Sequence, residues 1–152
     1  MEKSNKRIPF PQANNFNKIY DLICLDDELK LQDRKYLKHY LNLGTERQIS
    51  YYLSACEFLG IITHNKEYSE LGKQIRNANF DLKIIILSKT IISLPVFGEV
   101  FFMNYLYNEK FNNETISQLI SVIYGIDNYE VCKRRASTVE KWLQWINENK
   151  QL

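Results

Sequence analysis

The sequence is poor in the residues that build phosphate-binding loops and metal sites. Of its 152 residues, five are Gly, three are Cys and two are His. The glycines are scattered singly, so no Gly-rich phosphate-binding loop is present. The cysteines lie far apart without a Cys-x-x-Cys pair, which argues against a zinc site. We therefore predict no metal and no cofactor.

The sequence also lacks the pairing and the long apolar runs of secreted or membrane proteins. Cys24, Cys56 and Cys132 are odd in number and have apolar neighbours, so we expect three buried free thiols in a reducing cytoplasm. The first twelve residues contain no apolar segment of the kind a secretion signal needs. The longest apolar run, residues 84–92, is interrupted by polar residues and is too short to span a bilayer. These features predict a cytoplasmic protein without membrane contact.

The sequence also lacks a clear excess of positive or negative charge. Twenty Lys and Arg against 18 Asp and Glu leave a formal net charge of +2, so any nucleic-acid binding must depend on local clusters. With 45% hydrophobic and 25% charged residues, the composition is that of a globular protein. The length suggests one or two small domains.

No arrangement of acidic or histidine residues indicates catalysis. Residues 26–28, Glu67 and Glu70 are acidic but do not form the paired carboxylates with Lys that a nuclease uses. His39 and His64 have no Cys, Ser or Asp partner at a useful spacing. We therefore predict that this chain alone is not an enzyme.

The most informative stretch is residues 44–62, GTERQISYYLSACEFLGII. Thr45 and Gln48 have the spacing of a capping box that begins a helix, and Gly60 is suited to end it. An apolar stripe at helical spacing is predicted inside it, formed by Ile49, Tyr52, Leu53, Cys56 and Leu59. Residues 61–63 and 66–68 then indicate two short strands around a polar turn. A helix followed by such a hairpin predicts a winged helix-turn-helix, whose helix fits the major groove of DNA.

The flanking segments complete a first winged-helix unit over residues 13–79. Residues 1–12 are expected to be a flexible or extended arm, because Pro9 and Pro11 oppose helix. The basic residues of this arm could contact phosphates; they are Lys3, Lys6 and Arg7. Helices are predicted at residues 14–25 and 33–41, with a tight turn at Leu43–Gly44. A short helix at residues 69–77 follows the wing.

A second helix-turn-helix, winged-helix-like unit is predicted over residues 80–152. Residues 81–94 indicate a helix buried between the two halves, although their β-branched content leaves a strand possible. An aromatic helix at 96–107, a helix at 115–124 and a last helix at 128–147 follow. The segment from Arg134 can be aligned with that from Arg47, which suggests a tandem repeat. The second copy has no obvious wing.

The two recognition-type helices carry the residues expected to bind DNA. Arg and Gln are suited to reading bases, and Lys, Ser and Thr to holding phosphates. In the first unit the candidates are Thr45, Arg47, Gln48, Ser50, Tyr51, Ser54 and, in the wing, Lys66. In the second they are Lys133, Arg134, Arg135, Ser137, Thr138 and Lys141, in the densest cationic run of the chain. The alternative interpretation of that run is a solvated helix face.

Several segments resemble the tandem winged-helix modules attached to some bacterial type II restriction endonucleases. They are IPFPQANNFNKIYDLICL, GTERQISYYLSACEFLGII, YSELGKQI and RRASTVEKWLQWI, and the resemblance covers about residues 8–147. In such proteins the module recognises double-stranded DNA and a separate nuclease domain cuts. The resemblance implies a recognition module, a fragment of a larger enzyme or a stand-alone regulator, with a nuclease domain or subunit as a possible partner.

These observations predict a mainly α protein made of tandem winged helix-turn-helix units with a short β-hairpin wing. Its expected function is non-catalytic, sequence-specific binding of double-stranded DNA. The alternative is a protein–protein docking module on a winged-helix scaffold, because such folds also serve as docking domains and the net charge is modest. A third possibility, a catalytic fragment, would require metal-dependent cleavage of DNA by this chain.

Overall fold

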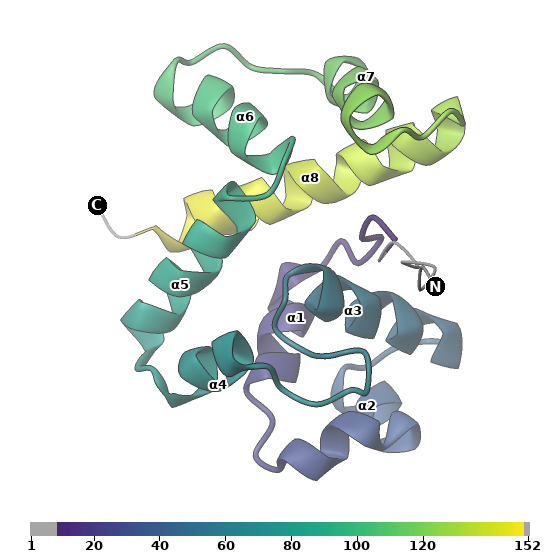
Figure 1. Ribbon diagram of the computed structural model, residues 1–152, viewed down its shortest axis with the longest axis vertical. Helices are drawn as coiled ribbons and strands as arrows, with labels where there is room; N and C mark the ends of the chain where they lie inside the picture. Colours follow the sequence, from purple (N-terminus) through teal and green to yellow (C-terminus); the bar gives the residue numbers. More distant parts are fainter. Residues whose placement is uncertain (1–8, 151–152) are drawn as a thin grey trace, which may run out of the picture.

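The computed structural model describes residues 9–150, and it is mainly helical, as the sequence predicts (Figure 1). The elements of the first half are α1 (Phe16–Ile23), the 3-10 turn η1 (Glu28–Gln32), α2 (Arg34–Tyr40), α3 (Glu46–Phe58) and α4 (Glu70–Asn77). Those of the second half are α5 (Phe80–Ile92), α6 (Phe97–Phe101), the π-helical turn η2 (Phe102–Leu106), α7 (Asn113–Tyr124) and α8 (Tyr129–Asn149).

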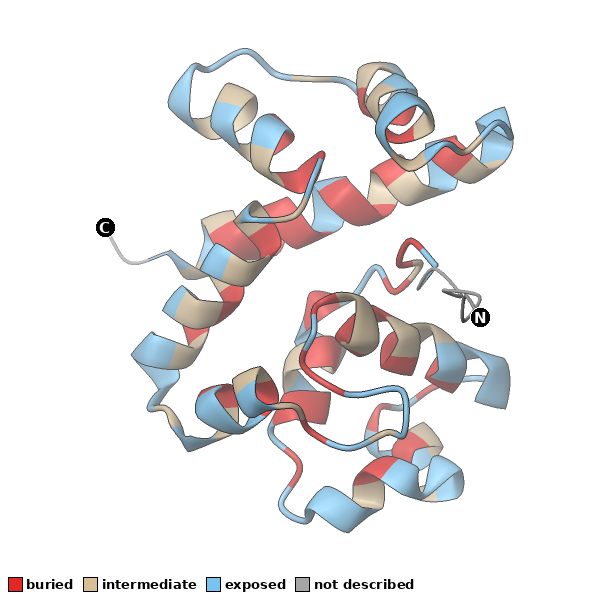
Figure 2. Cartoon of the chain, viewed as in Figure 1, coloured by how far each residue is buried: buried red, intermediate tan, exposed pale blue. Residues whose placement is uncertain are grey.

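Helix α8 is the central element of the fold. It runs between α6 and α7 on one side and the α1–α4 half on the other (Figure 1). Both of its tryptophans reach the first half: Trp142 Nε1 donates to the carbonyl of Ala13 at 2.7 Å, and Trp145 Nε1 donates to Asn17 Oδ1 at 3.0 Å. Much of α8 is therefore buried (Figure 2). Neighbouring elements thus pack against α8 on two sides.

Helix α3 has the predicted bounds and the predicted apolar stripe. Ile49, Tyr52, Leu53 and Cys56 are buried, and Leu59 is buried just after the helix ends. Gly60 has a φ of 75°, a conformation that suits glycine and ends the helix. The predicted match between apolar spacing and burial is confirmed here.

The predicted hairpin wing is only partly formed. The segment between α3 and α4 has one antiparallel bridge, between Ile62 and Tyr68, and residues 9–150 contain no β-strand. The Thr63 amide donates to the Glu67 carbonyl at 2.7 Å, and the Ser69 amide donates to the Ile61 carbonyl at 2.9 Å. The two predicted strands, each three residues long, instead form a narrow loop, because so few residues provide few ladder hydrogen bonds.

The two helices after α4 are less buried than predicted. The segment at 80–92 is a helix, so the strand alternative is wrong, but Leu82 and Ile85 are 45% and 54% exposed. The aromatic segment divides into α6 and η2, and Phe102 and Tyr107 are exposed. Its aromatic side chains are thus divided between the core and the surface.

The start of the described chain belongs to the core. The ring of Phe10 lies 4.8 to 5.6 Å from the rings of Tyr124, Phe97 and Phe58, measured between centroids. Residues 9–12 are not helical, as their prolines predict, but the packing of Phe10 fixes them, so the flexible form of the predicted arm is wrong there. Lys3, Lys6 and Arg7 lie outside the described residues. Buried side chains of both predicted units form one continuous core, and the boundary at residue 80 stays a prediction.

The three cysteines are free thiols, but only Cys56 and Cys132 are buried. Cys24 is exposed because it is the C-cap of α1, one residue beyond the last apolar side chain of that helix. Among the described helices, none is long and apolar enough to cross a membrane by itself. Helix α5 and the α6–η2 segment together have the length and apolar composition of a membrane span, but the two are bent by 110° relative to each other.

Candidate nucleic-acid interface

The first turn of α3 is held by Gln48 rather than by a reciprocal capping box. Gln48 Oε1 accepts a hydrogen bond from the Gly44 amide at 3.0 Å. Thr45 occupies the N-cap position, but its side chain makes no capping hydrogen bond. Neither hydrogen bond of the predicted capping box is therefore formed, because Gln48 bonds the amide of Gly44 and not that of the N-cap residue Thr45. Thr45 and Gln48 are both exposed at the start of the helix, although the carbonyl end of the Gln48 amide is already engaged.

The outer side of α3 presents Arg47 and Tyr51. Arg47 is exposed, and its guanidinium carbon lies 5.7 Å from the centroid of the Tyr51 ring. Solvent weakens a cation–π contact at an exposed site, so a ligand can compete with it. The guanidinium of Arg47 is exposed and therefore accessible to such a ligand. Ser54, one turn further along, is half-buried. The structure thus brings Arg47 and Tyr51 together as predicted and leaves Ser54 at the margin.

Ser50 has a partner that the sequence analysis missed. Arg34, the first residue of α2, donates from Nη2 to Ser50 Oγ at 2.9 Å and to the Glu46 carbonyl at 3.0 Å. Arg34 therefore fixes the start of α2 against the first turns of α3 and adds a cation beside Arg47. The sequence shows that Arg34 directly follows the N-cap residue Asp33. It does not show the contact with Ser50, because that contact depends on the angle between α2 and α3.

Lys66, in the loop that replaces the wing, is turned toward α3. Its Nζ lies 3.4 Å from Glu57 Oε2, and Nδ1 of His64 lies 3.3 Å from the other oxygen of Glu57. Lys66 has a φ of 62°, so the loop reverses direction at this residue. Glu57 offsets the charge of Lys66, and a contact between Lys66 and DNA would compete with this ion pair.

On α8 the exposed cations are Lys133, Arg134 and Lys141. The Lys133 ammonium lies 5.8 Å from the centroid of the Tyr129 ring. Lys141 stands two turns further along the helix, next to the exposed Glu140. The first turns of α8 therefore carry the denser positive charge, and the helix becomes mixed in charge toward its middle.

Three of the predicted α8 residues face inward. Thr138 is 1% exposed and donates to Asn14 Oδ1 at 2.5 Å, so its predicted place on the outer face is wrong. Arg135 is half-buried and donates from Nη1 to the Phe10 carbonyl at 3.1 Å. Ser137 is half-buried, and its Oγ accepts a hydrogen bond from Asn113 Nδ2 at 3.4 Å. The segment from Phe10 to Asn17 thus covers Arg135 and Thr138, whereas Ser137 lies against the start of α7.

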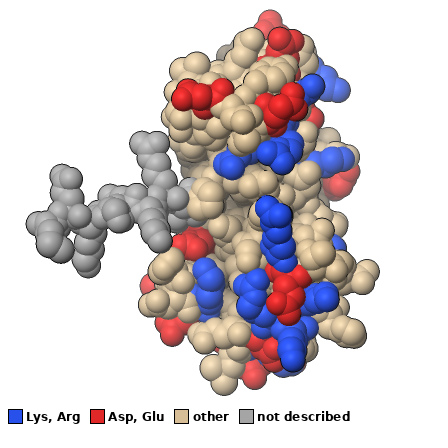
Figure 3. All heavy atoms as spheres, turned by 90° about the vertical axis from the view of Figure 1, so that its right-hand side faces the viewer, with Lys and Arg blue, Asp and Glu red and all other residues tan. Residues whose placement is uncertain are grey.

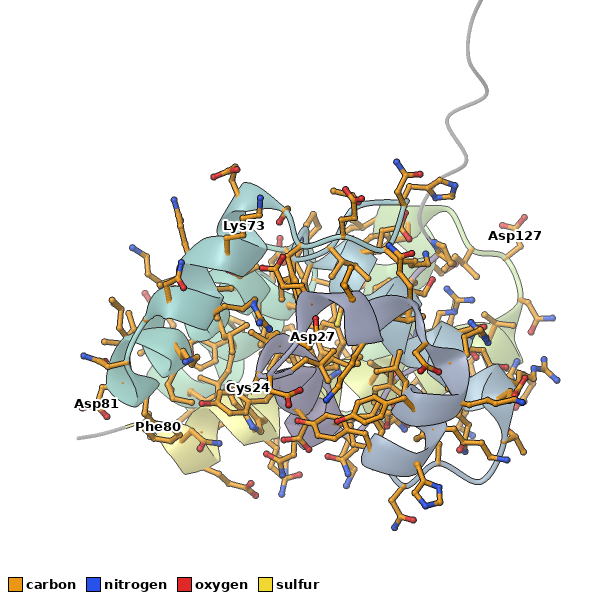
Figure 4. The ribbon with its side chains drawn as sticks, turned by 90° about the horizontal axis from the view of Figure 1, so that it is seen from below. Cys24, Asp27, Lys73, Phe80, Asp81 and Asp127 are labelled. Carbon is orange, nitrogen blue, oxygen red and sulfur yellow. The ribbon has the colours of Figure 1, made fainter. Side chains whose placement is uncertain are left out.

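The starts of α3 and α8 lie on the same side of the molecule, at the right in Figure 1. Figure 3 faces that side and shows Lys and Arg side chains in a band that extends over both halves. Acidic side chains interrupt the band. Asp127 points to solvent just before α8 begins (Figure 4). The band offers local positive charge of the kind that phosphates attract, although the net charge of the chain is small.

The described residues contain no group of three or more His, Cys, Asp or Glu placed to hold a metal ion. Ionisable groups with clearly shifted pKa values occur in the core, as for Cys56, and at its margin, as for Tyr124. Burial raises the pKa of Cys56 to about 12 and that of Tyr124 to about 12. Cys56 is fully buried and Tyr124 is half-buried, and in both cases the loss of solvent disfavours the charged form.

A family model matches residues 18–151, which is nearly the whole chain. The family is described as a domain of unknown function, DUF7226. The chain belongs to the DUF7226 family. The matched region of this DUF7226 chain includes both α3 and α8, so both helices of the candidate interface belong to the family's domain. Neither the curated proteins nor the solved structures gave a match.

Proposed function

We propose that this DUF7226 protein is a non-catalytic module that binds double-stranded DNA in a sequence-specific way. The observation that carries the proposal is that the starts of α3 and α8 lie on one side of the molecule (Figure 1), and that side has a band of Lys and Arg side chains (Figure 3). The exposed cations near these starts are Arg47 on α3 and Lys133 and Arg134 on α8. Two cationic helix ends on one face can contact one duplex together, since phosphates lie along its length.

In the finer form of this proposal, the chain holds two winged helix-turn-helix units. Helices α2 and α3 with the loop at 61–68 form the first, and α7 and α8 form the second. Arg47 in the first unit and Arg134 in the second read base edges, while Lys133 holds a phosphate of the DNA. The module serves a restriction system, with a nuclease domain or subunit as partner, or acts as a regulator. A cytoplasmic location is part of the proposal, because bacterial DNA lies there.

A gel-shift comparison of two charge-reversal variants tests the proposal. Arg47→Glu combined with Arg134→Glu should abolish the retardation of a duplex at low salt. The matched control is Lys73→Glu combined with Lys89→Glu, which changes the net charge equally at exposed positions on α4 and α5. The control should keep most of the binding, and both should keep the circular dichroism spectrum of the native fold. Equal loss in both variants would mean that only net charge matters.

A second test separates base reading from phosphate binding. Arg47→Ala should cost about 1–3 kcal/mol on a duplex selected from a random pool and much less on unselected DNA, if Arg47 reads a base. Lys133→Ala should weaken both duplexes alike and reduce the dependence of binding on salt. Failure of the random pool to yield a preferred sequence would contradict sequence-specific binding.

One observation favours protein docking as a second candidate. Apolar side chains lie exposed along α5 and η2: Phe80, Ile85, Phe102, Leu106 and Tyr107. Figure 4 shows Phe80 at the outer edge of the molecule. An exposed apolar surface of this kind is typical of a protein–protein contact. Absence of any duplex retardation at low salt would favour docking over DNA binding.

A further inference from the structure

A hollow of about 530 Å³ lies between the end of α3, the end of α7 and the middle of α8. Its lining includes Phe10, Phe58, Tyr124, Ile126 and Arg135. Small-molecule sites in proteins have volumes of roughly 300–1,000 Å³ and combine apolar walls with a few polar groups. The size and lining of this hollow therefore suit a small molecule.

The walls of the hollow are flat and aromatic. The Phe10 ring lies 5.6 Å from that of Phe58 and 4.8 Å from that of Tyr124, and the last two rings are 6.4 Å apart. The Tyr124 hydroxyl donates to the Pro95 carbonyl at 2.8 Å, which fixes its ring. Aromatic faces held in this way favour a flat apolar ligand, since ring pairs gain energy beyond the area they bury.

Arg135 is the one charged side chain among these lining residues. Its guanidinium carbon lies 5.9 Å from the centroid of the Phe10 ring, which offsets its charge only weakly. Nη1 donates to the Phe10 carbonyl, whereas Nε is buried and has no acceptor within residues 9–150. No carboxylate of the described residues forms a salt bridge with it. Burial lowers the pKa of Arg135, which indicates that its charge is held at a cost. An anion in the hollow would relieve that cost.

We propose that this hollow binds a small aromatic carboxylate, with its ring against the half-buried Phe58 and Tyr124 and its carboxylate accepting hydrogen bonds from Arg135. The guanidinium selects an anion over a neutral molecule, because carboxylates match its planar donors. The aromatic walls select a flat apolar body over inorganic phosphate. The proposal does not depend on DNA binding.

Calorimetric titration of the full chain with 2-naphthoate tests the proposal, with 2-naphthamide as the neutral analogue of the same shape. Naphthoate should bind, and the amide should bind at least about tenfold more weakly, because it lacks the charge that Arg135 recognises. Absence of naphthoate binding at millimolar concentration, or equal affinity for the two compounds, would overturn the assignment.

Two Arg variants locate the site. Arg135→Lys should weaken naphthoate binding about tenfold, because Lys keeps the charge but loses the planar donors. The control is Arg76→Lys: Arg76 also donates Nη1 to a carbonyl, that of Ile23, and lies 4.3 Å from an aromatic centroid, that of Tyr68. Arg76 does not line the hollow. Equal weakening in both variants, with unchanged circular dichroism, would overturn the proposal.

The other candidate occupant is a second copy of the chain. Ile123, 44% exposed, lies at the rim of the hollow. If the chain forms dimers that Ile123→Glu dissociates and naphthoate fails to bind, the hollow is an interface between copies and the ligand proposal is wrong. A monomer that binds naphthoate supports the ligand proposal.

Discussion

At the scale of single residues, burial gives the three thiols different chemistry. Cys24 is exposed at the end of α1, whereas Cys56 and Cys132 are buried, and burial raises the pKa of Cys56 to about 12. A thiol reagent needs access and a thiolate. We therefore predict that a thiol-reactive reagent whose product absorbs light, used at about pH 8, labels Cys24 rapidly in the native protein. It should label Cys56 and Cys132 only after unfolding. Rapid labelling of Cys56 in the native protein would contradict the packing of α3.

Tyr124 should make the protein less stable in alkali. Burial is the main cause that raises its pKa from 10.0 to about 12, so the unfolded chain releases this proton first. The stability that the protonated Tyr124 hydroxyl contributes is fully present below pH 10. It is lost as the pH rises toward 12, because the unfolded state then binds fewer protons than the folded state. Urea unfolding at about pH 8 and about pH 11 should show a smaller loss of stability in Tyr124→Phe than in the wild type. Equal losses would contradict the burial of this hydroxyl.

Residue patterns predicted Arg47 and Arg134 at the surface but failed for Thr138 and Arg135. The difference lies in the range of the contacts. Arg47 is exposed because α3 has one packed side, which apolar spacing predicts. Thr138 and Arg135 are covered by Asn14 and Phe10, more than 120 residues away in the chain, and local spacing contains no information about that contact.

At the scale of elements, α4 packs tightly on the loop that replaces the wing. A Cβ added at Gly72 would lie 2.2 Å from the Ile61 carbonyl oxygen, so backbone must move to accommodate it. Gly72→Ala should therefore lower the free energy of unfolding by about 1–3 kcal/mol. Gly44→Ala is the control, since its Cβ would meet no atom nearer than 3.9 Å. Urea denaturation measures both, and similar stabilities would contradict the close approach of α4.

Helix bounds were predictable where end signals are local, and less so where neighbours decide. The bounds of α3 follow from Thr45 and Gly60, and the structure has them. The incomplete formation of the predicted wing could not be foreseen, because pairing of two three-residue strands depends on the elements that pack against them. The exposed side of α5 was also missed: its apolar residues occur nearly all round, and only the placement of neighbouring helices decides which face is covered.

At the scale of the whole molecule, α8 connects the halves and sets the distance between the two candidate DNA-binding helix ends. Trp142 and Trp145 bind α8 to the segment that leads into α1, and α1 in turn contacts α3. The starts of α3 and α8 are therefore held in one rigid arrangement through buried contacts. Sequence periodicity suggested two repeated units but could not place them relative to one another.

The most direct measurement is amide chemical-shift mapping by NMR during titration with a duplex of about two helical turns, roughly 20 base pairs, which is long enough for both helix ends. We predict that signals from the first turns of α3 and of α8 shift together, at the same duplex concentration, while those of the exposed α5–η2 surface stay unchanged. Shifts confined to α5 and η2, or no shifts at low salt, would contradict the account.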